Sequence, residues 1–168
     1  MNLAGGVARN DPACVAAFFK AYHPGVYRYM LCLTGSREDA EDLAQDSLLQ
    51  AKGHIRSYRG DSGLKTWVHR VAFRTFTHWN RRRKPRGEWS SAIPAKEGPF
   101  EKIDAEQALL SALAKIGPAL AQPIVLQEIN DLSVEEIASI LDIPSGTVKS
   151  RLYTARQRLR DIFGETPC

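Results

Sequence analysis

Two stretches of the chain are rich in side chains that bind phosphates and base edges, and neither contains an acidic residue. Eight Lys or Arg residues fall within residues 65–86, and five fall within residues 147–160. Their guanidinium and ammonium groups suit DNA phosphates and the base edges of the major groove. A third stretch, residues 38–46, holds five acidic residues and no basic one. This distribution predicts contact with a polyanion at two places and with a different partner at the third.

The basic stretch near the C-terminus belongs to a predicted helix-turn-helix over residues 133–160. Ser133 and Glu136 are spaced as a capping box, in which each side chain bonds the other's free backbone amide. Residues 142–146 end that first helix. Four apolar positions of the second helix fall within about a 60° arc: Val148, Leu152, Ala155 and Leu159. A different arc carries basic and hydrogen-bonding side chains, so the unit matches a reader of the major groove, with a solvated helical hairpin as the alternative.

The other basic stretch lies on a predicted helix from Leu64 to about Arg83, which divides into an apolar and a polar half. Arg70, Arg74 and Arg81 line up within about 40° on the polar half, where a row of this kind could track a phosphate backbone. Three side chains outside the apolar half are better candidates to touch bases: His69, Phe73 and Asn80. The preceding loop, residues 58–63, is polar and glycine-rich with one aromatic side chain; it could hold an unstacked base or be only a loop.

The acidic stretch lies on a predicted helix over residues 39–51. Asp42, Gln45 and Leu49 fall nearly opposite its apolar face. A leucine among acids and amides is typical of a protein contact. A single exposed leucine is also common on solvated faces. On the residues alone, both interpretations stay open.

Only helical periodicity recurs along the chain. It covers residues 12–34, 39–59 and 64–83 and resumes from Ala105 to about Phe163, with no stretch of convincing period two. Pro24-Gly25 is expected to break or kink the first segment. Residues 85–104 hold three Pro and two Gly without sustained periodicity. The predicted fold class is therefore all-α, with helical domains over residues 12–84 and 105–163 joined by a flexible linker over 85–104.

Composition bounds the function further. With 43% hydrophobic and 25% charged residues, the 168-residue chain is able to build real cores. It has neither an apolar run long enough for a bilayer nor a secretion signal. Cys14 and Cys32 are expected to be buried as small apolar residues, and Cys168 to be a loose terminal thiol; a redox role for them stays undecided. These features predict a soluble cytoplasmic protein with no membrane insertion and no metal or cofactor.

Two rival classes of protein also contain DNA-binding helices. A nucleic-acid enzyme needs metal-binding carboxylates or a nucleophile near its basic surfaces. Here the acids gather at residues 38–46 beside an outward leucine and no histidine, and no P-loop or zinc spacing occurs. We therefore expect no catalytic residue and no small-molecule substrate. A stand-alone helix-turn-helix regulator with an N-terminal sensing domain is the other rival, and the second basic helix argues against it.

Three segments, in this order, resemble the extracytoplasmic-function (ECF, group IV) sigma factors, the smallest sigma-70-family subunits of bacterial RNA polymerase. The segments are DAEDLAQDSLLQA, SYRGDSGLKTWVHRVAFRTFTHWNRRRK and LSVEEIASILDIPSGTVKSRLYTARQRLR. The resemblance covers about residues 15–163, and the order is more specific than any one segment. It implies promoter-specific transcription initiation without chemistry of the chain's own. The implied partners are core RNA polymerase, promoter DNA and an anti-sigma factor.

The resemblance also implies a role for each segment. The residues implied to bind core polymerase, here called the docking set, are Asp39, Asp42, Gln45, Asp46 and Leu49. Recognition of the −10 element falls on residues 58–83, with the −10 set Tyr58, Arg59, Asp61, Ser62, Lys65, His69, Arg70, Phe73, Arg74, Thr77, Asn80 and Arg81. Recognition of the −35 element falls on residues 145–160, with the −35 set Ser145, Thr147, Lys149, Ser150, Arg151, Tyr153, Thr154 and Arg156.

Three departures from the family pattern carry expectations of their own. Thr154 stands where many relatives have a basic residue, so the −35 preference is expected to differ. Pro123 falls where a helix former is more usual. Because proline costs ~3 kcal/mol inside a helix, that helix is expected to begin near Gln122. Asn130-Asp131-Leu132 replaces a commoner Glu-Gly-Leu turn, with little expected effect.

Overall fold

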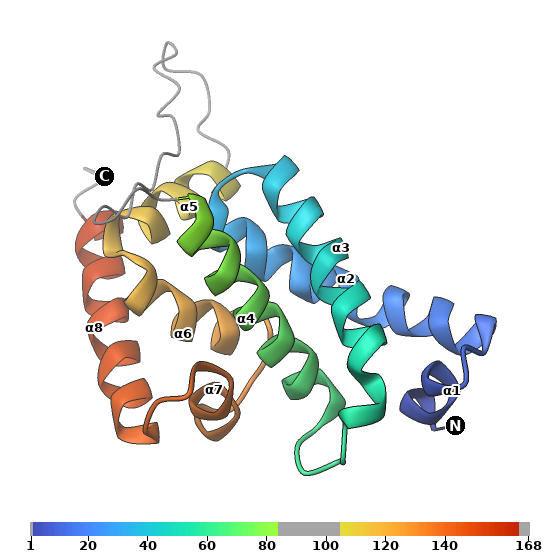
Figure 1. Ribbon diagram of the computed structural model, residues 1–168. Helices are drawn as coiled ribbons and strands as arrows, with labels where there is room; N and C mark the ends of the chain where they lie inside the picture. The colour runs from blue at the N-terminus through green and yellow to red at the C-terminus, as the bar shows by residue number, and fades with distance from the viewer. Residues whose placement is uncertain (1, 84–104, 165–168) are drawn as a thin grey trace.

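A computed structural model describes residues 2–83 and 105–164, and within them all regular structure is helical. The helices form an N-terminal group, within residues 3–83, and a C-terminal group, within residues 105–164, which pack against each other (Figure 1). The all-α, two-domain prediction is confirmed. The predicted linker, residues 85–104, lies outside the described residues, and the exact domain bounds stay a prediction.

The N-terminal domain is built around one long helical hairpin. Its elements are α1 (Leu3–Ala8), α2 (Pro12–Thr34), α3 (Arg37–His54), a 3-10 turn (Ile55–Ser57) and α4 (Leu64–Arg83). Asp11 caps α2 by accepting the N–H groups of Ala13 and Cys14, with Pro12 at the first helical position. Gly35, at φ +66°, ends α2 in the left-handed conformation that glycine adopts without strain. The hairpin of α2 and α3 then packs against α4.

Helix α2 is continuous through Pro24 and Gly25, so the expected break does not occur. Phe18 before the proline and Val26, Tyr29 and Met30 after it are all fully buried in one core. Burying large apolar side chains on both sides stabilises the helix by more than the roughly 3 kcal/mol that an interior proline costs.

The C-terminal domain consists of α5 (Ala105–Ile116), α6 (Pro118–Glu128), α7 (Val134–Leu141) and α8 (Ser145–Gly164). The expectation that a helix begins near Gln122 is wrong. Helix α6 begins at Pro118, whose fixed φ suits the first helical position, and Pro123 lies inside the helix. Pro123 and its neighbours Ala121 and Ile124 are buried, and this packing offsets the backbone penalty.

The predicted helix-turn-helix is present as α7 and α8, with its capping box complete. The Glu136 N–H donates to Ser133 Oγ over 3.1 Å, and the Ser133 N–H donates to Glu136 Oε2 over 2.8 Å. Asp142, at φ +55°, ends α7. The predicted apolar face of α8 packs inward, because Val148, Leu152 and Ala155 are buried. The opposite face of α8 is left to solvent.

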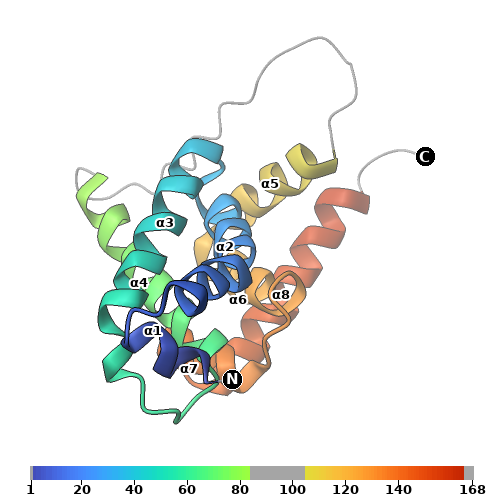
Figure 2. The ribbon, with the colours of Figure 1, turned by 90° about the vertical axis from the view of Figure 1, so that its right-hand side faces the viewer.

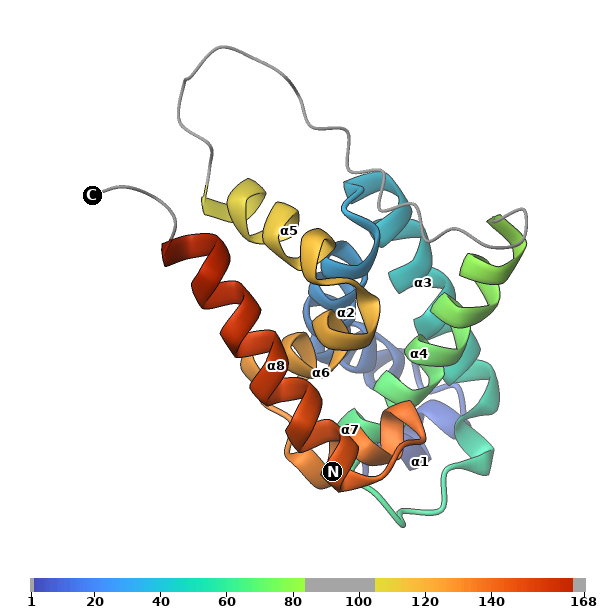
Figure 3. The ribbon, with the colours of Figure 1, turned by 90° about the vertical axis from the view of Figure 1, so that its left-hand side faces the viewer.

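The packing of the two domains against each other has no counterpart in the sequence patterns. Helix α7 lies against α4, and both α5 and α6 lie against α2. Figures 2 and 3, which view the molecule from its two sides, place α3 and α8 on opposite flanks with α2 and α6 between them. Across the described ranges, 2–83 and 105–164, no helix has the length and apolar character that a bilayer crossing requires.

Candidate partner and nucleic-acid interfaces

Helix α3 presents most of the docking set on one exposed face. Its Ala40, Leu43, Ala44, Ser47, Leu48 and Ala51 are buried. The side chains of Asp42, Gln45 and Asp46 are exposed on the opposite face, and Leu49 beside them is 58% exposed. Their spacing of three, four and seven residues places them on one stripe of the helix. The result is an acidic surface with one large apolar side chain.

Helix α1 adds to this surface, which sequence reasoning did not predict. Val7 and Ala8 of α1 line an open hollow of about 440 Å³ together with Leu49 and residues at the end of α3. Asn2 caps α1, and Arg56 donates to the Ala8 carbonyl over 3.4 Å. Leu49 therefore stands at the rim of a concave patch. The capping residue Asn2 was the available signal, but the helix has only six residues.

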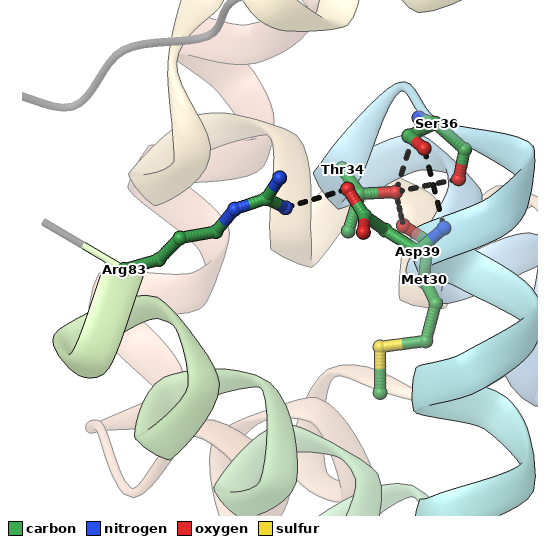
Figure 4. A network of polar contacts seen from close by, with 5 residues as sticks. All are labelled: Met30, Thr34, Ser36, Asp39 and Arg83. Atoms are coloured by element: carbon green, nitrogen blue, oxygen red, sulfur yellow. Dashed lines mark hydrogen bonds and ion pairs between the residues drawn. The ribbon is translucent and has the colours of Figure 1, made fainter.

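Asp39 differs from the rest of the docking set because it forms an ion pair with a side chain of another helix. Figure 4 shows Arg83 reaching from the end of α4 to the Asp39 carboxylate, a contact of 2.6 Å. In the same view Ser36 Oγ accepts the Asp39 N–H over 3.2 Å and so caps α3. The Ser36 N–H in turn donates to Thr34 Oγ1 over 3.2 Å. Asp39 thus joins the first turn of α3 to the last turn of α4.

The loop over residues 58–63 is closed by its own aromatic residue. The Tyr58 hydroxyl donates to the Ser62 carbonyl over 2.7 Å, and the Tyr58 ring lies 5.6 Å from the ring of Trp67. Gly60 has a φ of +81°, which a side chain would strain. Arg59 and Asp61 are exposed at the tip. The loop is therefore a shaped turn with polar side chains pointing outward.

The second half of α4 opens to solvent beside α3. Arg74 and Arg81 are exposed, while Phe73, Thr77 and Asn80 are half-buried. An open hollow of about 560 Å³ lies between the two helices. Its lining joins the docking set to the −10 set through Asp46, Phe73, Arg74, Thr77 and Arg81. It also includes residues that sequence reasoning missed: Gln50, His78 and Arg82.

The first half of α4 is covered by the C-terminal domain. His69 is 1% exposed. Arg70 donates through its guanidinium to Ser139 of α7, and Arg70 Nε is buried without a hydrogen-bond partner among the described residues. The sequence interpretation placed His69 on a polar face, whereas the structure buries it between the domains. Contact of His69 or Arg70 with DNA stays a prediction, and in this arrangement α7 lies in the way.

His69 and Asn130 form a buried polar bond between the domains. His69 Nδ1 lies 2.9 Å from the Lys65 carbonyl, which only accepts, so Nδ1 carries the proton and Nε2 is an acceptor. The Asn130 side-chain amide donates to His69 Nε2 over 3.1 Å and to the Gly25 carbonyl over 2.9 Å. The expectation that the 130–132 turn has little effect is therefore wrong for Asn130.

Acidification is expected to weaken the packing of the two domains, because His69 must be neutral to fit between them. Burial lowers the pKa of His69 from 6.5 to about 4. Between these pH values the separated domains bind a proton that the packed domains do not. The free energy that favours the packed domains is thus largest above pH 6.5. It falls by up to about 3 kcal/mol as the pH falls towards 4.

The nearby titratable groups act outside that pH range. The Ser133 N–H holds the pKa of Glu136 below its usual range, so the contribution of Glu136 is lost only in stronger acid. Burial raises the pKa of Tyr29, which stays neutral. Small-angle X-ray scattering between pH 7.5 and 5 measures the separation of the domains. In His69→Gln, a carbonyl oxygen that does not titrate replaces Nε2, so equal pH dependence in this variant would contradict the assignment.

Helix α8 presents the −35 set on its outer face. Ser145, Lys149, Ser150 and Arg156 are exposed, and Tyr153 is 67% exposed. Thr147, Arg151 and Thr154 are half-buried. The Thr154 hydroxyl donates to the Ser150 carbonyl over 3.0 Å. Two residues of α6 that sequence reasoning missed, Gln127 and Glu128, accept from the Arg156 guanidinium, the latter over 3.0 Å. They orient Arg156 at the edge of the surface.

Metal-ligating groups and cysteine thiols can be located only in the part of the chain that the structure describes. No group of three or more His, Cys, Asp or Glu residues there could hold a metal ion. Cys14 is buried, and Cys32 is half-buried with its pKa raised by burial to about 12. The Cys32 thiol is therefore a poor nucleophile. Cys168 lies outside the described residues.

Two family models match the chain, Sigma-70 region 2 over residues 18–86 and Sigma-70 region 4 over residues 106–159. The RNA polymerase sigma factor YlaC of Bacillus subtilis is 29% identical over 151 residues, covering 84% of this chain and 87% of YlaC. An ECF RNA polymerase sigma-E factor of Salmonella typhimurium is 31% identical over 137 residues, covering 72% of each. The matched ranges contain all of the docking, −10 and −35 sets.

Two solved structures share the fold. CnrH in complex with the cytosolic domain of CnrY has a TM-score of 0.78 at 17% identity, covering 98% of this chain and 97% of the other. The sigma factor RpoE of Bartonella quintana, crystallised with the anti-sigma factor NepR, has a TM-score of 0.74 at 24% identity, covering 89% and 96%. Both likenesses concern the fold of the chain.

Proposed function

The chain belongs to the ECF group of sigma-70 factors, promoter-specific initiation factors of RNA polymerase, and from this premise we propose how its surfaces divide the work. The exposed face of α3 binds core polymerase, α4 with the 58–63 loop binds the −10 element, and α8 binds the −35 element. The observation that supports this division most is the separation of α3 from α8 on opposite flanks (Figures 2 and 3). A protein and a DNA duplex can therefore be bound at once.

The proposed polymerase contact rests on the character of the α3 face. Leu49 is a large apolar side chain at the rim of a hollow, and Asp42 and Asp46 lie on the same stripe. Buried apolar anchors supply most of the affinity of an interface, while charges around them set orientation and association rate. The partner surface is therefore expected to offer an apolar contact to Leu49 and basic side chains to Asp42 and Asp46.

The proposed promoter contacts divide into phosphate binding and base reading. Lys149, Arg74 and Arg81 are exposed cations without a hydrogen bond to an acid among the described residues, which suits phosphates and makes binding salt-dependent. Arg156 and Tyr153 on α8 present donors that suit base edges. On α4, the half-buried Phe73 and Asn80 are the candidates for unpaired bases.

An anti-sigma factor is the third proposed partner. Both structural neighbours were solved in complexes, one of them with the anti-sigma factor NepR and the other with the cytosolic domain of CnrY. We propose that a protein of this kind binds the same surfaces here. We further propose that the chain acts in the cytoplasm and is not an enzyme, so that catalysis is performed by the polymerase.

Run-off transcription with purified core polymerase tests the proposal. We expect the chain to restore initiation from a defined start site on a template that carries its −10 and −35 elements, and core polymerase alone to give none. Specific binding to an operator without polymerase, with no effect on initiation, would instead support a stand-alone regulator.

A further inference from the structure

Helix α7 covers the N-terminal half of α4, and two side-chain hydrogen bonds join the two helices. Thr66 is 1% exposed, and its hydroxyl donates to Glu136 Oε1 over 2.9 Å. Arg70 donates to Ser139 one turn further along α4. His69 lies between them and accepts from Asn130. Two members of the −10 set are therefore occupied by side chains of the other DNA-binding domain.

Asn130 is the most central of these contacts. Its amide bonds α4 through His69 and α2 through the Gly25 carbonyl, and it is 2% exposed. Gly25 allows the approach, because a Cβ at that position would lie 3.3 Å from Asn130 Nδ2. Only the nitrogen of the amide suits this place, since both neighbouring atoms are acceptors. Asn130 thus pins three helical segments from two domains together.

The contact between the domains also contains buried polar atoms that destabilise it. Asn130 Oδ1 and Arg70 Nε are buried without hydrogen-bond partners among the described residues. Buried unpaired polar atoms are costly to leave in place. A contact with such atoms can be opened at smaller cost than a fully satisfied apolar core. Arg70 regains its full hydrogen-bonding capacity once α7 moves away.

The docking face stays open in the same arrangement. Asp42, Gln45, Asp46 and Leu49 are exposed, and α3 lies on the flank of the molecule away from α7 and α8 (Figure 3). The closed chain thus offers its polymerase-binding surface while half of α4 is covered. This asymmetry sets an order for the binding events.

We propose that Asn130 latches the free chain in a self-closed state, which is able to bind core polymerase but binds the −10 element only after the two domains separate. The inference rests on the proposed function, because it assigns α3 to polymerase and α4 to DNA. It adds that the chain blocks its own −10 surface without any second protein.

A pair of matched substitutions tests the latch. Asn130→Asp is isosteric but replaces the donating nitrogen by a second oxygen, which faces the Gly25 carbonyl and removes the donor. Gln122→Glu makes the same chemical change at the same domain contact, but there the Tyr29 hydroxyl donates to Gln122 Oε1 over 3.2 Å, so the acceptor survives. Thr66→Val, which removes the hydroxyl bonded to Glu136, tests the latch from the N-terminal domain.

Three measurements on the full chain are made for each variant at pH 7.5. They are the radius of gyration from small-angle scattering, binding of a labelled single-stranded −10 oligonucleotide without polymerase, and binding to core polymerase. We expect Asn130→Asp and Thr66→Val to expand and to bind the oligonucleotide at least tenfold more tightly. The wild type and Gln122→Glu should stay compact. Affinity for core polymerase should change less than twofold.

Several outcomes would overturn the latch. One is a wild-type chain as expanded in solution as Asn130→Asp, and another is that both opening variants stay compact. Circular dichroism identifies a variant that fails to fold. If Asn130→Asp or Thr66→Val fails in this way, the other of the two tests the latch. Failure of the proposed function looks different: compaction would still depend on Asn130, but no variant would direct run-off transcription with core polymerase.

Discussion

Leu49→Arg is expected to lower affinity for core RNA polymerase at least tenfold and to remove most run-off transcription. Leu49 is 58% exposed on α3, so the fold does not need it, yet it lines a hollow and shares its exposed stripe with Asp42 and Asp46. Truncating an apolar anchor at the centre of an interface costs about 2 kcal/mol or more, and each 1.4 kcal/mol is a factor of ten. Arginine also brings a charge that the interface would have to desolvate.

The measurement is fluorescence anisotropy of labelled chain titrated with core polymerase, followed by transcription. Phe163→Arg is the matched control, because Phe163 is another large hydrophobic residue, 47% exposed, and lies outside the docking, −10 and −35 sets. Its affinity should stay within twofold of wild type. The free energy of unfolding of both variants, measured by thermal unfolding, should differ from wild type by less than about 0.5 kcal/mol, as expected for surface positions. Equal losses in both variants would assign the polymerase contact to another surface.

The helix-turn-helix was predictable because its signals are local. Ser133 and Glu136 are three residues apart, and the α8 face repeats every three or four residues, so neither depends on the rest of the fold. The start of α6 was not predictable in this way. The proline penalty at Pro123 is a local term, whereas the burial that outweighs it comes from neighbouring helices. A local rule failed where tertiary packing opposed it.

The residues of the candidate surfaces also differ in whether local sequence patterns could predict their environment. Helical spacing alone predicts the outward stripe of Asp42, Gln45 and Leu49. Of the five residues in the docking set, which the resemblance implies, the structure leaves four exposed. The fifth, Asp39, pairs with Arg83, which is 44 residues away in sequence. The bond from Asn130 to Gly25 spans 105 residues. No periodic pattern carries information about contacts at such separations, so the closed arrangement and the burial of His69 were beyond sequence reasoning.

Arg156→Ala is expected to weaken −35-dependent initiation by about 5–150-fold, which corresponds to the 1–3 kcal/mol of a well-placed base contact. Arg156 is exposed on α8, and its guanidinium is oriented by Gln127 and Glu128. Its 3.0 Å ion pair with Glu128 is exposed, so losing it should change stability by only about 0–1 kcal/mol. The variant should therefore fold normally and lose discrimination between −35 sequences.

Lys149→Ala is the comparison that distinguishes base reading by Arg156 from a charge effect on the DNA phosphates. Lys149 is exposed one helical turn before Tyr153, and as a phosphate contact its loss should weaken all promoters alike and reduce the salt slope by about one. Initiation by both variants is measured on a panel of single-base −35 substitutions at several salt concentrations. For Arg156→Ala, initiation should no longer depend on the base at one or two positions of the −35 element. For Lys149→Ala, initiation should fall by the same factor on every template. A uniform loss in both would make Arg156 a phosphate contact, and Tyr153, at 67% exposure, would then be the side chain left to read the bases.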